Sequence, residues 1–185
     1  MAILNSMEKT NQQYDKVIDI CRTVFLEKME DYGTAWRVLR PVSITDQIYI
    51  KARRIRSIEE KGISKINEGV IPEFMGIINY SIIGLIQLEL PPSENNLETN
   101  IALEMYNRYF AGAKALMQNK NHDYGEAWRK MRISSYTDLI LMKLKRIKQI
   151  EDNEGKTMVS EGIDANYLDI INYAAFALIK INFEK

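Results

Sequence analysis

The sequence predicts an all-α fold, a helical bundle of two tandem three-helix repeats related by a pseudo-twofold axis. Residues 28–60 and 120–152 align without a gap, and 17 of the 33 aligned positions are identical. Apolar residues recur with helical spacing, and no useful stretch alternates with the period of two that a strand requires. One three-helix unit alone would bury too little surface, so the two copies should pack against each other.

Each copy is expected to contain three helices at matching positions. The expected segments are 10–31 and 98–120 for the first helix, the stretches that begin near Ser43 and Ser135 for the second, and 72–90 and 164–182 for the third. Ser43 and Ser135 each stand two residues before a Thr, so a Ser or Thr side chain is predicted to cap the second helix. Pro72 suits a first helical turn.

The repeats are expected to meet at a short linker. Residues 1–90 form repeat 1, residues 91–97 form a Pro- and Asn-rich linker, and residues 98–185 form repeat 2. The two repeats are predicted to make one compact structural unit. Exposed apolar helix faces could also drive homodimer formation.

The amino-acid composition indicates which binding partners and which cellular compartment to expect. Lys and Arg together number 25, as do Asp and Glu, and this balance argues against binding of long nucleic acid through a net positive field. The single Cys21 cannot form an internal disulfide and suits a reducing compartment. The longest apolar stretch, 77–90, carries polar residues and is too short to span a bilayer. We therefore expect a cytoplasmic protein with no membrane partner.

The motif Asp-Tyr-Gly-x-Ala-Trp-Arg occurs at 31–37 and again at 123–129. Its glycines, Gly33 and Gly125, are expected to adopt a positive φ where the first helix ends. The motif contains the only two tryptophans of the chain, one per repeat.

The aromatic residues of this motif allow two interpretations. Trp36 and Trp128 can be core anchors, which is the usual fate of such residues. Alternatively, they stack on a nucleobase together with Tyr32 and Tyr124.

Lys51 and Lys143 fall on the apolar face of the second helix in both copies. A lysine in that position needs an anion, which can be an acid of the third helix or the phosphate or carboxylate of a ligand. Arg54 and Arg146 lie at the border of the same face, where a guanidinium fork could hold phosphate.

Two asparagines, Asn79 and Asn172, point inward from the third helix. A buried amide needs hydrogen-bond partners, so each Asn is either a structural bridge to a neighbouring helix or a support for a metal-binding carboxylate.

The repeats differ in their acids. Asp169 is replaced by Gly76 in repeat 1, whereas Glu161 has a counterpart in Glu68. Glu161 and Asp169, with Asp138 from the second helix, form an oxygen-donor set that would suit Mg²⁺ held with substrate phosphates. Each acid could instead be solvated. The asymmetry predicts at most one complete metal site.

The chain resembles the nucleotide modification associated domain 1 family of bacteria and phages, formerly a domain of unknown function. The motifs that carry the resemblance are Lys-x-x-Asp-Tyr-Gly-x-Ala-Trp, Asp-x-x-x-x-Lys-x-x-Arg-Ile, Glu-Gly and Ile-Ile-Asn-Tyr. They cover roughly 22–89 and 112–182. A late Asp-x-x-Asn-Tyr of single-copy members is matched by 169–173 and not by 76–80, which favours metal binding in repeat 2.

A more distant resemblance is to the all-α nucleoside triphosphate pyrophosphatases of the MazG and dimeric dUTPase type. Those enzymes hold Mg²⁺ with acids on two helices, including a Glu-Glu-x-x-Glu motif that this chain lacks. The resemblances imply a Mg²⁺-dependent nucleotide-processing enzyme, such as a pyrophosphohydrolase. The alternative is a non-catalytic nucleotide-binding or helical protein-interaction module.

Overall fold

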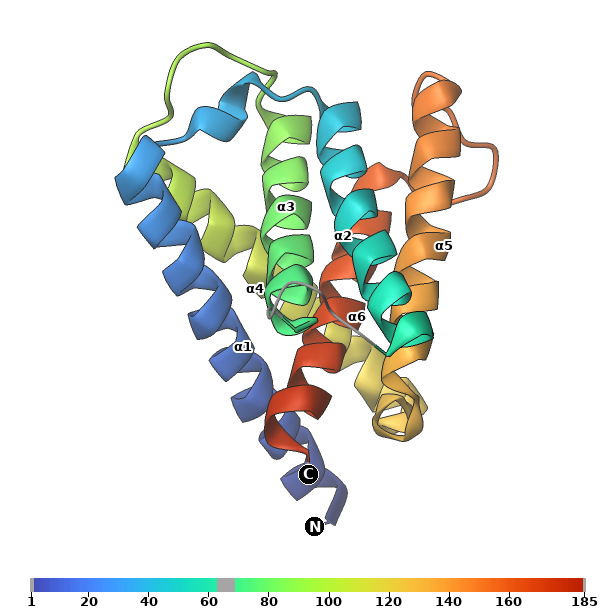
Figure 1. The fold of residues 1–185 in the computed structure, drawn as a ribbon. Helices are drawn as coiled ribbons and strands as arrows, with labels where there is room; N and C mark the ends of the chain where they lie inside the picture. Colours follow the sequence, from blue (N-terminus) through green and yellow to red (C-terminus); the bar gives the residue numbers. More distant parts are fainter. Residues whose placement is uncertain (1, 63–68, 185) are drawn as a thin grey trace.

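The computed structural model describes residues 2–62 and 69–184, which form six long helices and two 3-10 turns (Figure 1). Repeat 1 contains α1 (Ala2–Tyr32), η1 (Ala35–Val38), α2 (Pro41–Lys61) and α3 (Ile71–Glu89). Repeat 2 contains α4 (Thr99–Tyr124), η2 (Ala127–Lys130), α5 (Ile133–Asp152) and α6 (Ile163–Phe183). No strand occurs in these residues. The predicted all-α fold with two tandem repeats is confirmed.

Helices α2, α3, α5 and α6 form the centre of the bundle. α3 packs against α6, α2 packs against α5, and each second helix also packs on the third helix of its own repeat. Figure 1 shows α1 and α4 crossing one side of this centre, where each contacts both α3 and α6. The repeats therefore share one hydrophobic core.

Contacts between α2 and α5 occur in symmetric pairs. These are the hydrogen bonds Thr45–Glu151 (2.6 Å) and Thr137–Glu59 (2.9 Å), and the ion pairs Asp46–Lys148 (2.5 Å) and Asp138–Arg56. Each contact has its mate at the equivalent positions of the other repeat, as a pseudo-twofold axis between the two helices requires.

Two buried asparagines join the first helices to the third helices. The amide nitrogen of Asn79 donates to the carbonyl oxygen of Cys21 (3.1 Å), and its amide oxygen accepts from the hydroxyl of Tyr106 in the other repeat (2.8 Å). Asn172 forms the same two bonds, to a backbone carbonyl of α4 (3.0 Å) and from Tyr14 (2.7 Å). Each amide thus holds three helices together.

The two glycines of the repeated motif adopt the predicted conformation. Gly33 has a φ of 62° and Gly125 has a φ of 59°, and each donates its N–H to the carbonyl four residues earlier. A residue with a Cβ is disfavoured in this left-handed region, which explains why both copies have Gly where the first helix ends.

The motif's Arg continues this turn in repeat 1. The Arg37 guanidinium donates to the carbonyl oxygens of Leu90 (3.0 Å) and Pro91 (2.7 Å). Gln87 donates back to the carbonyls of Arg37 (3.0 Å) and Leu39 (2.7 Å). These bonds fix η1 against the end of α3.

The predicted Ser or Thr caps of the second helices are wrong. α2 begins at Pro41 after an extended Arg40, and α5 begins at Ile133 after an extended Arg132; no side chain caps either helix. Proline's fixed φ suits the first position of α2. Thr45 instead lies inside α2, where it bonds Glu151 across the pseudo-twofold axis.

α3 is long and apolar enough to cross a membrane by length and composition, with a mean hydropathy of 1.4 in its most apolar window. In the bundle, 67% of that window is buried among the other helices. A central position in the core therefore accounts for the apolar composition of α3.

The cross-repeat hydrogen bonds of the asparagines should contribute to stability. Tyr106→Phe leaves the buried amide oxygen of Asn79 without its donor, and such a loss costs about 1–3 kcal/mol. Urea unfolding of this variant and of the exposed-site control Tyr124→Phe should show the loss in Tyr106→Phe alone. Equal stability of the two variants would contradict this role.

Candidate functional site

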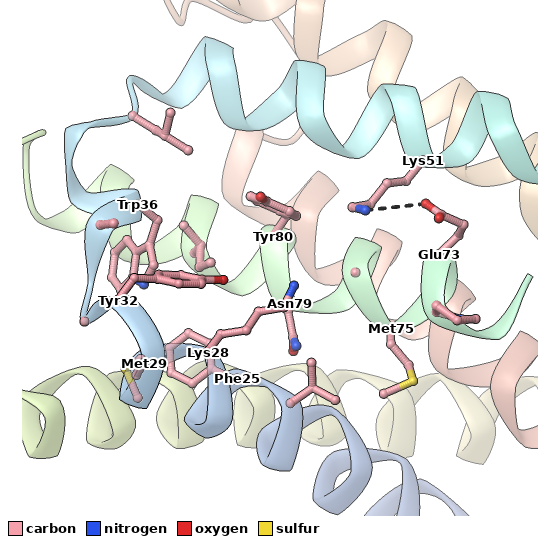
Figure 2. A pocket seen from close by; sticks show the side chains of 17 residues that line it. Phe25, Lys28, Met29, Tyr32, Trp36, Lys51, Glu73, Met75, Asn79 and Tyr80 are labelled. Carbon is pink, nitrogen blue, oxygen red and sulfur yellow. Dashed lines mark hydrogen bonds and ion pairs between the residues drawn. The ribbon is translucent and has the colours of Figure 1, made fainter. Parts of the chain in front are cut away.

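Repeat 1 encloses a cavity of about 730 Å³ between α1, η1, α2 and α3. Figure 2 shows the aromatic side chains of Tyr32 and Trp36 at one end of the cavity and the Lys51–Glu73 ion pair at the other, with Tyr80 between them. The cavity therefore has an aromatic end and a charged end.

Repeat 2 contains a smaller cavity of about 230 Å³ at the equivalent place. Every residue that lines it has its counterpart in the lining of the first cavity. The pairs are Phe25/Met117, Lys28/Lys120, Met29/Asn121, Tyr32/Tyr124, Ala35/Ala127, Trp36/Trp128, Leu39/Met131, Gly76/Asp169, Asn79/Asn172, Tyr80/Tyr173 and Ile83/Phe176. The duplication has therefore produced two related cavities, named here pocket 1 and pocket 2.

The charged end of pocket 1 contains more cations than acids. The ammonium of Lys51 lies 3.4 Å from a carboxylate oxygen of Glu73, and Arg54 pairs with the other oxygen. Lys28 lines the same pocket and forms no ion pair with any residue in 2–62 or 69–184. A cationic group is thus available to a ligand anion.

Gly76 makes room for Lys51 in this pocket. A Cβ at position 76 would lie 2.8 Å from Cε and 2.9 Å from Cδ of the lysine, which is closer than such atoms approach in proteins. The lysine stem therefore lies directly over the glycine. The ammonium also lies 5.9 Å from the ring centroid of Tyr80.

Pocket 2 contains a carboxylate where pocket 1 contains Gly76. One oxygen of Asp169 lies 2.6 Å from Lys120 and the other lies 2.6 Å from Lys143. Burial alone would raise the pKa of the Asp169 carboxyl, but hydrogen bonds and positive charge from the two lysines outweigh burial and lower it. The Lys120 pKa is raised in turn, because the carboxylate outweighs desolvation.

The aromatic ends of the two pockets also differ. Trp128 stacks on Phe176 with ring centroids 4.3 Å apart and planes at 9°. In pocket 1 the residue equivalent to Phe176 is Ile83, and the aromatic neighbour of Trp36 is Phe25 at 6.4 Å and 39°. Among the described residues, no parallel ring is stacked on the Trp36 indole.

Both tryptophans are anchored, with exposed fractions of 8% for Trp36 and 6% for Trp128, and both also line a pocket. Neither indole N–H has an acceptor among the described residues. Tyr32 and Tyr124 are far more exposed, at 54% and 74%, and line the same pockets.

The structure separates the three predicted metal ligands. Asp138 lies at the α2–α5 surface, where it pairs with Arg56, whereas Asp169 lies in pocket 2 between two lysines. Glu161 is exposed, and its counterpart Glu68 lies outside the described residues. No three His, Cys, Asp or Glu side chains gather into a metal-binding group within residues 2–62 and 69–184.

Two of the predicted residues lie close to pocket 2 without lining it. Burial raises the pKa of the Tyr173 hydroxyl, the negative charges of Asp169 and Glu161 raise it further, and Lys120 and Arg146 act in the opposite direction. Glu161 and Arg146 thus lie within electrostatic range of Tyr173, and Arg146 lines a separate, shallower cavity with residues 156–160.

The predicted phosphate ligands have different surroundings. Lys51 lines pocket 1, and Arg54 shares Glu73 with it. Lys143 is almost fully buried against Asp169. In each repeat the lysine on the apolar face of the second helix therefore pairs with an acid of the third helix.

Asn79 and Asn172 line the pockets, but their amides bond to helix backbone and to a tyrosine hydroxyl, as structural bridges do. Sequence reasoning missed Lys28 and Tyr80, with their counterparts, as pocket residues. The same residue at the equivalent position of both repeats was the one sign in the sequence that these residues matter. A helical wheel shows one helix at a time, so it cannot reveal which residues line a cavity between four elements.

The fold defines a duplicated all-α protein with related cavities of different size at equivalent places in its two repeats. The sequence profile of nucleotide modification associated domain 1 matches residues 28–88 and 120–181, so the chain belongs to that family. Searches of curated proteins and of solved structures gave no significant match. The more distant resemblance to all-α pyrophosphatases has no support from these comparisons.

Asp169 should stabilise the fold through its two lysines. Asp169→Asn leaves the buried Lys143 without its counter-charge, and loss of one partner of a buried pair costs ~3–5 kcal/mol. The exposed-pair control Asp138→Asn should cost at most about 1 kcal/mol. Urea unfolding at pH 7 measures both, and equal losses would contradict the assignment.

The stabilisation by Asp169 should also depend on pH. Because the two lysines hold the pKa of the folded Asp169 carboxyl below its ordinary value, the contribution is present above the unfolded pKa and is lost as the pH falls through the folded pKa. The stability difference between wild type and Asp169→Asn should therefore stay constant from pH 7 to 5 and shrink below about pH 4. A difference that does not change over this range would show that the carboxylate is not held ionised by its lysines.

Proposed function

We propose that the chain binds a nucleotide in pocket 1. The observation that carries this proposal is a single cavity with Tyr32 and Trp36 at one end and Lys51 at the other, with Lys28 as a second lysine in its lining. Its volume of about 730 Å³ falls within the range of about 300–1,000 Å³ typical of small-molecule sites.

The two ends of pocket 1 match the two chemical parts of a nucleotide. A tryptophan or tyrosine face stacks on any nucleobase, and such stacking contributes about 1–3 kcal/mol per base. Lysine ammoniums bind phosphate as compact point charges. The unsatisfied indole N–H of Trp36 is a further donor that a base oxygen or nitrogen could accept. The description of the family, nucleotide modification associated, agrees with this ligand class.

The donors present do not favour a metal held by the protein alone. In pocket 1 the carboxylate of Glu73 is already shared by Lys51 and Arg54, and in pocket 2 both oxygens of Asp169 face lysines. We therefore propose binding in which lysines, and not a protein-held Mg²⁺, hold the anion.

Removal of a pocket cation should weaken nucleotide binding. Lys28→Ala should reduce affinity about 10- to 100-fold, because a charge-assisted hydrogen bond contributes roughly 1.5–3 kcal/mol. Lys28 is exposed and has no described ion pair, so thermal unfolding should hardly change. Isothermal titration calorimetry with 5′-mono- and triphosphates of adenosine, guanosine, cytidine, uridine and thymidine measures the effect.

The repeat itself supplies the matched control, Lys120→Ala, which removes the equivalent lysine from pocket 2. This variant should bind with wild-type affinity. Equal effects of the two substitutions, or no binding of any tested nucleotide by the wild type, would refute the proposal.

Binding should not need a divalent ion. Titrations of the same nucleotides in EDTA and in Mg²⁺ should give affinities within about threefold, since the anion is held by ammonium groups rather than by carboxylate-bound metal. Binding that disappears in EDTA, together with EDTA-sensitive release of phosphate or pyrophosphate, would instead support the metal-dependent hydrolase expected from the sequence.

A further inference from the structure

We infer that pocket 2 is occupied by two side chains of its own repeat, which take the places of the anion and the ring of a nucleotide. The chain would then bind one nucleoside 5′-monophosphate unit, in pocket 1. This inference rests on the proposed function and deepens it, because pocket 2 shows where each part of the ligand would lie.

Asp169 occupies the place of the anion. Its two oxygens contact Lys120 and Lys143 at 2.6 Å each, so these ammoniums are close enough to share one small anion. The equivalent lysines, Lys28 and Lys51, also line pocket 1, from α1 and α2. Position 76, which corresponds to Asp169, is glycine, so this position offers them no carboxylate.

The acid of pocket 1 lies about one helical turn before the position that corresponds to Asp169. Glu73 lies three residues before Gly76, and the residue equivalent to Glu73 in repeat 2 is Asn166. The Lys51 stem passes over Gly76, and its ammonium reaches Glu73 at 3.4 Å rather than the 2.6 Å of the Lys143–Asp169 pair. The ion pair of Lys51 is therefore longer than that of Lys143, and its acid comes from a different position of the third helix.

Phe176 occupies the place of the ring. It stacks in parallel on Trp128, with centroids 4.3 Å apart, as a nucleobase would stack on an indole. Ile83 at the equivalent position of α3 has no ring, and the cavity volume rises from about 230 Å³ in pocket 2 to about 730 Å³ in pocket 1. The larger cavity thus lacks both side chains that fill the smaller one.

The spacing of these two side chains indicates the size of the ligand. Asp169 and Phe176 lie seven residues apart on α6, which corresponds to roughly 10.5 Å along a helix axis. A nucleoside monophosphate covers a comparable span from its base to its phosphate. Further phosphates of a triphosphate would have to extend beyond the two lysines.

Transfer of the repeat 2 acid into pocket 1 tests the inference. In the variant Glu73→Asn/Gly76→Asp, the new carboxylate should pair with Lys28 and Lys51 and weaken nucleoside monophosphate binding at least tenfold. The three atoms nearest to a Cβ at position 76 all belong to the flexible end of Lys51, so the variant should fold. Gly112→Asp is the control, because this exposed helix glycine has open space around it and should leave binding unchanged.

The reverse variant, Asp169→Gly/Phe176→Ile, should open pocket 2. Titration calorimetry with AMP, GMP, CMP, UMP and dTMP should then give a stoichiometry of two per chain instead of one. Its thermal unfolding temperature should rise more than that of the wild type on addition of inorganic pyrophosphate, because the anion replaces the lost carboxylate. If this variant fails to fold, the test of the inference rests on the transfer variant, Glu73→Asn/Gly76→Asp.

The outcomes separate the inference from the proposed function. One site in the wild type, lost in Glu73→Asn/Gly76→Asp and retained in Gly112→Asp, supports both. Two sites in the wild type, or full binding by the transfer variant, overturns the inference but leaves nucleotide binding intact. No binding by the wild type, with binding by the reverse variant, overturns the proposed function and supports self-occupation of pocket 2. No binding by either protein overturns both.

Discussion

The ion pairs of one buried carboxylate, Asp169, set pocket 2 apart from pocket 1. Asp169 accepts hydrogen bonds from two lysines that approach it from different helices, and burial strengthens the attraction between these charges. Repeat 1 contains both equivalent lysines without that acid. In repeat 1 Lys51 pairs with Glu73 and Lys28 has no ion pair among the described residues, and this difference is the basis of the proposed anion site.

The scaffold around this difference is the same in both repeats. Both first helices end at a left-handed glycine, both motif tryptophans anchor a 3-10 turn, and both inward asparagines receive a tyrosine hydroxyl from the other repeat. These bonds cross between the repeats, so the two pockets share one frame. Within that frame the inferred difference between the pockets rests on two positions of the third helix, 76/169 and 83/176.

Much of the fold follows from local patterns in the sequence. Residue spacing and backbone preference predict the duplication, the apolar third helices and the glycine turns. The same patterns occur in both repeats, so each repeat supports the prediction separately. The inward lysines were also predictable, because a charge on an apolar helical face needs a partner. Their acids, Glu73 and Asp169, could be placed on the third helix for the same reason.

The rest depends on contacts between helices that one helix cannot reveal. Asp138 was grouped with Asp169 because both are acids of repeat 2, but the pseudo-twofold axis places Asp138 beside Arg56 of repeat 1. The caps of the second helices were misplaced because Thr45 and Thr137 resemble capping residues, whereas they bond glutamates across the same axis. Lys28 could not be assigned to a pocket until α1 was placed against α3.

The tryptophans, one in each pocket, allow the most direct test of the account. Fluorescence of Trp128→Phe and Trp36→Phe variants would be recorded while nucleoside monophosphates are added. Stacking in pocket 1 predicts quenching of Trp36 emission in Trp128→Phe and unchanged Trp128 emission in Trp36→Phe. Quenching of Trp128 with no response from Trp36 would contradict the assignment of an open first pocket and a self-occupied second one.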